Sequence, residues 1–188
     1  MEDLTEVIGY EHILDLRFSS SPGQFATEYW DATLKREHYT AENVNSGGTE
    51  IVLATAQLAR VNLSGAWLDS LDATSETLAA VGAAFVERDR IIKLDEDAMF
   101  ARSLVIIDHI EVLPEYRGAR ISHNFVRGIG RVFHGELLAL MPAGEMEDDS
   151  DAPVEDILKF DGLRRHWERA GFVRVPDTNV MMLPLGSR

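Results

Sequence analysis

The chain has 188 residues and a hydrophobic content of 45%, enough to bury one sizeable core, so we expect a single domain spanning residues 1–188. It has no cysteine, which excludes disulfides and thiolate metal sites. The formal net charge of -14 opposes binding to nucleic acid or anionic lipid, because both would repel the protein at long range. The same charge suits solubility, and it would also attract a cationic partner.

The N-terminus shows no targeting signal. The first six residues, MEDLTE, are acidic and lack the basic and apolar regions of a signal peptide. The longest apolar runs of the chain are too short to cross a bilayer. We therefore expect a cytoplasmic protein that does not associate with membranes.

The first third of the chain predicts two strands and a helix. Residues 10–18 fit a strand or a short helix, and we favour the strand. Residues 24–39 follow a Pro-Gly turn and carry large apolar residues at helical spacing, so we expect a helix there. These apolar residues are Phe25, Tyr29, Trp30 and Leu34. Residues 50–63 are rich in β-branched residues and predict a long strand.

Residues 71–90 predict a second helix. Leu78, Val81 and Phe85 form an apolar stripe at helical spacing. Asp72 or Thr74 is available to cap its N-terminus. The residues that follow, 93–98, are polar and acidic, so this helix should lie at the surface.

Residues 104–133 predict a strand, a turn and a helix in immediate succession. Residues 104–113 are mostly apolar and β-branched, and Pro114 ends the strand because it cannot donate a ladder hydrogen bond. Apolar residues return at helical spacing over 121–133. The first-turn N–H groups of such a helix have no internal partner, so this arrangement can bind an anion.

The remaining elements complete an alternating α/β pattern. Residues 135–142 predict a short buried strand, parallel to the preceding strand if the helix between them is a crossover. Residues 143–151 contain five acidic residues and predict a loop, either a solvated charge run or a cation site. Pro153 opens a helix that Gly171 ends. Its expected inward positions are Val154, Ile157, Leu158, Leu163 and Trp167. Residues 172–185 predict a final hairpin.

Two motifs carry a resemblance to a known family. Residues 112–122, VLPEYRGARIS, resemble the acyl-CoA pyrophosphate signature of the Gcn5-related N-acetyltransferases (GNAT), roughly V-x-P-x-x-R-G-x-G-x-G/A. The chain departs from it at Arg120, where the family has glycine, and at Ser122, where it has Gly or Ala. Residues 167–172, WERAGF, resemble the second signature, aromatic-x-x-x-G-F. The alternative is that the first motif is an ordinary strand-to-helix turn.

The resemblance implies an α/β fold with a mixed, mostly antiparallel sheet flanked by helices. Two parallel central strands would splay apart, with the pantetheine arm of the cofactor in the gap. Residues 103–185 would form the cofactor-binding half of the domain. The helix at 71–90 would be an insertion near the acceptor side, with a partner-binding helix as the alternative.

The resemblance also implies a site for acetyl-CoA. Its expected cofactor-binding residues are Val112, Arg117, Gly118, Ala119, Arg120, Ile121 and Ser122. Backbone amides from this stretch would bind the diphosphate, assisted by the helix dipole. Arg120 adds a side chain where the family has none, so either the turn is displaced or the guanidinium pairs with phosphate.

Direct transfer of an acetyl group to a primary amine, possibly cationic, is the reaction that the resemblance implies. The candidate bases are Asp108 and Glu111, which lie on the strand that carries such residues in some relatives. Strand alternation places Asp108 on the face of Val112. Trp167 stands where many relatives have a tyrosine that protonates the thiolate. The alternative is therefore a non-catalytic acyl-CoA-binding or protein-interaction module.

Two further questions concern metals and assembly. His123 and His134 are not spaced to share a helix face as a metal pair, so we predict no metal site. The sequence leaves a homodimer open.

Overall fold

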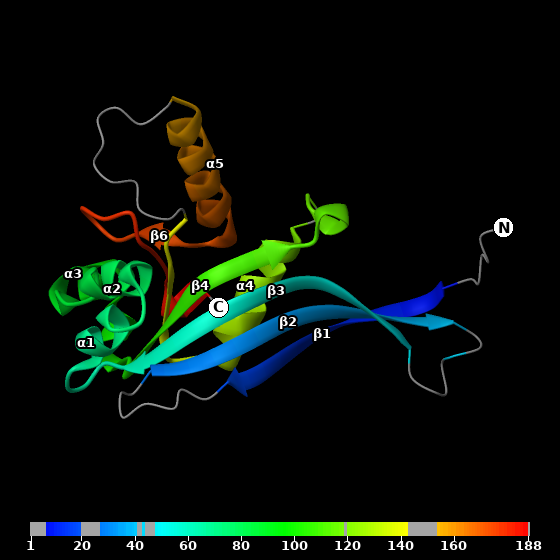
Figure 1. The fold of residues 1–188 in the computed structure, drawn as a ribbon, viewed down its shortest axis with the longest axis horizontal. Coiled ribbons are helices and arrows are strands. Elements are labelled where there is room, and N and C mark those ends of the chain that lie inside the picture. The colour runs from blue at the N-terminus through cyan, green and yellow to red at the C-terminus, as the bar shows by residue number, and fades with distance from the viewer. Residues whose placement is uncertain are drawn as a thin grey trace.

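The computed structural model describes residues 7–19, 27–40, 43, 48–118, 120–142 and 154–187. Its centre is a seven-stranded sheet in the order β1-β2-β3-β4-β5-β7-β6 (Figure 1). The strands are β1 Val7–Ser19, β2 Thr27–Thr40, β3 Thr49–Asn62, β4 Ser103–Val112, β5 Leu137–Leu140, β6 Val173–Arg174 and β7 Met181–Leu183. All neighbouring pairs are antiparallel except β4 and β5, which run parallel.

Helices cover both faces of this sheet. The α-helices are α1 Trp67–Asp72, α2 Glu76–Ala83, α3 Arg88–Leu94, α4 Ile121–Val132 and α5 Val154–Ala170. Helices α4 and α5 pack on one face, where Phe125, Ile129 and Trp167 meet Val105 and other strand residues. Helices α1 to α3 pack on the opposite face (Figure 1). The predicted α/β class, with a mostly antiparallel sheet flanked by helices, is confirmed.

The N-terminal strands correct one prediction. Residues 10–18 fall in β1 as expected, but most of the helix predicted over 24–39 is strand β2. The helical prediction was wrong because it placed Tyr29 and Trp30 on one buried face, whereas they pack on opposite faces of the sheet. Ala32 and Leu34 are buried at alternate positions, the period of a strand. Phe25 lies outside the described residues.

The inserted segment is helical, but it is not the single helix predicted over 71–90. It forms α1, α2 and α3, separated by turns around residues 73–75 and 84–87. The predicted caps are also wrong, because Ser75 caps α2 by accepting a hydrogen bond from the Leu78 amide. The apolar stripe Leu78, Val81 and Phe85 is buried as predicted. It packs on the sheet face away from α4 and α5.

The strand–turn–helix–strand prediction over residues 104–142 is confirmed. Strand β4 ends at Val112, a short 3₁₀ turn follows over Pro114–Tyr116, and α4 leads to the parallel strand β5. The β4–β5 pairing runs only from Leu104↔Leu137 to Ile107↔Leu140. The last five residues of β4 therefore extend beyond the end of β5.

Strand β4 also contains an irregularity that changes which side chains face the core. Ile107 pairs with Leu58 and His109 pairs with Gln57, so Asp108 is an extra residue in the ladder. Beyond this bulge, Ile110 and Val112 pack against the same core as α4. The simple alternation that grouped Asp108 with Val112 does not hold across the bulge.

The C-terminal part agrees with the sequence. Helix α5 ends at Ala170, followed by Gly171 at a φ of +103°, and the predicted hairpin is formed by β6 and β7. The acidic segment 143–151 lies outside the described residues, as do Pro153 and the side chains of Val154, Ile157 and Leu158. In the ranges that the structure covers, no helix combines the length and apolar character needed to cross a bilayer.

The packing of α4 on the sheet can be tested with two variants of one helix. Ile129 is fully buried, so Ile129→Ala should lower the free energy of unfolding by about 2 to 5 kcal/mol. Val132 is 52% exposed, so Val132→Ala should change it by less than about 0.5 kcal/mol. Urea denaturation measures both values. Equal losses in the two variants would contradict this orientation of α4.

Candidate functional site

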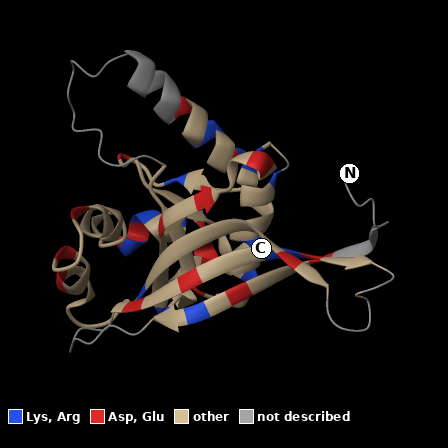
Figure 2. Cartoon of the chain, turned by 45° about the vertical axis from the view of Figure 1, so that its right-hand side comes forward, with Lys and Arg blue, Asp and Glu red and all other residues tan. Residues whose placement is uncertain are grey.

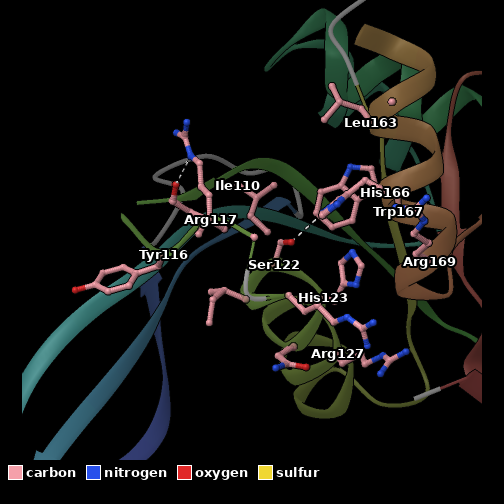
Figure 3. Close-up of a pocket in the computed structure, with 16 residues that line it drawn as sticks. Ile110, Tyr116, Arg117, Ser122, His123, Arg127, Leu163, His166, Trp167 and Arg169 are labelled. Carbon is pink, nitrogen blue, oxygen red and sulfur yellow. Dashed lines mark hydrogen bonds between the residues drawn. The ribbon is translucent and has the colours of Figure 1, made fainter. Parts of the chain in front are cut away.

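A cavity of about 1050 Å³ lies where β4 extends past β5, between the turn after β4, the start of α4 and one face of α5 (Figure 3). Strand β4 contributes two apolar side chains, while the turn and the two helices contribute most of the polar groups. The described residues that line it are Ile110, Val112, Tyr116, Arg117, Gly118, Arg120, Ile121, Ser122, His123, Asn124, Arg127, Gly162, Leu163, His166, Trp167 and Arg169.

The structure brings the predicted cofactor-binding residues together in this cavity. Six of them line it, namely Val112, Arg117, Gly118, Arg120, Ile121 and Ser122. The seventh, Ala119, lies outside the described residues. The cavity also includes a face of α5, more than 40 residues further along the chain.

The turn before α4 has an unusual backbone. Gly118 has a φ of +89°, which glycine adopts readily, and a side chain added there would meet no atom within 4 Å. Arg120 has a φ of +57°, a left-handed conformation that costs an ordinary residue roughly 1 to 2 kcal/mol. The turn holds Arg120 in this conformation despite the cost. The exposed Arg120 side chain lines the cavity.

Helix α4 begins directly after Arg120, which makes no side-chain capping bond. The Arg120 carbonyl accepts the first helical hydrogen bond, from the Asn124 amide at 3.1 Å. The earlier amides, on Ile121, Ser122 and His123, have no acceptor within the helix. Because these three residues line the cavity, this end of α4 can present N–H groups to an anion.

The charge of the cavity is opposite to that of the chain as a whole. Four arginines line it, Arg117, Arg120, Arg127 and Arg169, and none of the described lining residues is Asp or Glu. Asp and Glu residues lie along the strands, on the inserted helices, in the turn after β4 and on other faces of α5 (Figure 2). In the described parts of the chain, these arginines form no ion pair with a carboxylate. The cavity is therefore a positively charged region on an acidic protein.

A polar cluster connects the two helices across the cavity. Ser122 Oγ lies 2.9 Å from His166 Nε2, within hydrogen-bond distance (Figure 3). The rings of His123 and His166 lie 4.4 Å apart between centroids. The Nε2 atom of His123 has no hydrogen-bond partner among the described residues. Because it is buried, this nitrogen is not open to a ligand in the cavity.

Both histidines of this cluster have a lowered pKa. Burial lowers the pKa of His123 below its ordinary value of 6.5, and repulsion from His166 adds to this effect. Arg127 and Arg120 act in the same direction. Burial also lowers the pKa of His166, with a further contribution from Arg169. The two imidazoles are therefore neutral near pH 7, each with one N–H donor and one acceptor nitrogen.

The structure does not bring the predicted bases into the cavity. Asp108 lies at the bulge of β4 and Glu111 pairs with Thr55 across the ladder. Both are exposed, and neither lines the cavity. Trp167 does line it, with 5% of its surface exposed.

Several lining residues were missed from the sequence. Arg127, His166 and Arg169 had no assigned role, and His123 was considered only as a metal ligand. Their spacing contains a partial signal, because His123 and Arg127 are four residues apart and His166 and Arg169 are three apart, so each pair shares a helix face. The sequence does not show that these two faces meet.

Comparison with known proteins identifies no relative. No family model, curated protein or solved structure matches the chain. As far as the described residues go, no group of three or more His, Asp or Glu side chains is placed to hold a metal ion.

The lowered pKa values make stability depend on pH. The folded state binds fewer protons than the unfolded chain once the pH falls below about 6.5, so protonation favours unfolding. Between pH 7.5 and 5.5, the wild type should therefore lose more unfolding free energy than the His123→Gln/His166→Gln variant. Urea titrations at the two pH values measure this difference.

The exposed His134 provides the matched control for that experiment. His134→Gln shows the effect of removing one surface histidine by the same substitution. Equal losses in the wild type and the double variant would contradict the lowered pKa values.

Proposed function

We propose that the chain binds acyl-CoA in this cavity, with acetyl-CoA as the simplest ligand, and transfers the acyl group directly to a primary amine. The observation that carries the proposal is the positively charged cavity around the N-terminus of α4. A diphosphate needs several donors at once. The first-turn amides of α4, with Arg117 and Arg120 beside them, would supply these donors.

The end of β4 supports the same ligand. Beyond Ile107 this strand has no β5 residue beside it, and Ile110 and Val112 line the cavity with apolar surface. An extended arm that contains amide groups, such as pantetheine, could pair with this free edge as an added strand does. The resemblance implies that the pantetheine arm lies in a gap between two splayed strands. In this proposal the arm lies instead along the end of β4 that extends past β5.

The chemistry requires no covalent intermediate on the protein. The amine nitrogen attacks the thioester carbonyl, a C–N bond forms as the C–S bond breaks, and the CoA thiolate leaves. The attacking ammonium must first lose a proton to a base or to water. Asp108 and Glu111 remain the proposed bases, and the proton would reach them through water because neither lines the cavity. The net charge of -14 would favour a cationic acceptor.

A second candidate function is a non-catalytic acyl-CoA-binding or protein-interaction module. Two observations favour it. Trp167 is buried and its indole has no acidic proton to transfer to a thiolate, and neither Asp108 nor Glu111 reaches the cavity.

Calorimetry with acetyl-CoA and a thiol-release assay with a panel of amines test both candidates. Binding at about a hundred times Kd should stabilise the fold by roughly 2.7 kcal/mol. An enzyme should also release thiol, with kcat/KM highest for polyamines or lysine-rich peptides and decreasing as salt rises. Heat of binding without thiol release would reject the enzyme and support the non-catalytic binding module. No heat at millimolar acetyl-CoA would reject both.

The left-handed backbone of Arg120 permits a clean test of its side chain. Arg120→Gly removes the guanidinium but suits the observed φ, so the turn should keep its shape. We expect the affinity for acetyl-CoA to fall by about 1 to 3 kcal/mol, the range for hydrogen bonds to charged groups, with no loss of unfolding free energy. Calorimetry and urea denaturation measure these values. Unchanged or tighter binding would show that Arg120 obstructs the site.

A further inference from the structure

A second group of basic side chains lines the cavity beyond the turn. His123 and Arg127 lie one helical turn apart on α4, and Arg169 lies on the facing side of α5. All three line the cavity, on the wall where α4 faces α5 (Figure 3). At a rise of 1.5 Å per residue, Arg127 is about 6 Å further along α4 than His123 in the first turn. Arg127 therefore lies about one turn beyond the first-turn amides.

No carboxylate lies in the described lining to balance the positive charges of this wall. Arg127 lowers the pKa of His123, and Arg169 lowers the pKa of His166, because each guanidinium lies near the histidine pair. The two guanidiniums therefore line one wall from facing helices (Figure 3). An anion between them would offset their charge.

We infer that Arg127 and Arg169 form a second anion subsite, which binds a phosphomonoester carried elsewhere on the ligand. This inference rests on the proposed function, because in CoA the corresponding group is the 3′-phosphate of the ribose. The two guanidiniums each present several donors to phosphate oxygens. The subsite makes the protein selective for ligands with two separate phosphate centres.

The test compares ligands that differ only in this phosphate, using the full chain. CoA and 3′-dephospho-CoA form one pair, and adenosine 3′,5′-bisphosphate and adenosine 5′-monophosphate form the second. Calorimetry should show the phosphate-bearing member of each pair binding about tenfold more tightly or better. Arg127→Gln and Arg169→Gln should each reduce this ratio by roughly threefold or more. Arg131→Gln, an exposed arginine of α4 outside the cavity, should leave the ratio unchanged.

The outcomes separate this inference from the proposed function. If CoA and dephospho-CoA bind equally well, the subsite is wrong and acyl-CoA binding stands. If the bisphosphate is preferred through Arg127 and Arg169 while CoA does not bind, the subsite stands and the proposed function fails. If the preference survives both arginine variants, the phosphate binds elsewhere and the assignment is overturned. If no ligand binds, both proposals fail.

Discussion

The short parallel pairing of β4 with β5 is the constraint on which the candidate site depends. The two strands share only four residue pairs, and α4 crosses between them. This crossover places the start of α4 beside the end of β4, so helix amides and strand edge border one cavity. Because β5 is short, the last residues of β4 have no paired strand on that side among the described residues. The bulge at Asp108 then turns Ile110 and Val112 toward the core beneath α4.

Much of the fold could be predicted from local sequence patterns, and the wrong predictions have identifiable causes. Pro114 and Gly171 mark element ends that the structure confirms. The segment that forms β2 was misread because large apolar residues at adjacent positions satisfy a helical pattern as well as a strand pattern. The breaks between α1, α2 and α3 contain neither proline nor glycine at residues 73–75 and 84–87, so neither of these helix-breaking residues marks them.

The candidate site was predictable only where it is contiguous in sequence. The turn and first helical residues line one cavity because neighbours in sequence remain neighbours in space. The contribution of α5 depends on how two helices face each other, and no local pattern specifies that. The position of Asp108 was missed for another reason. A bulge adds one residue to a ladder, and the two adjacent polar residues that mark it, Asp108 and His109, were read as part of a regular strand.

The polar cluster that links α4 to α5 gives the cavity a mechanical role. The arginines that line it come from the turn after β4 and from the two helices, which meet in the described structure through Ser122 and His166 and through the neighbouring histidine rings. A multivalent anion in contact with both helices would act as a noncovalent cross-link, and it would replace charge repulsion with attraction. Occupancy would then restrain the opening motions of α5, so that part of the binding free energy is spent in ordering the helix pair.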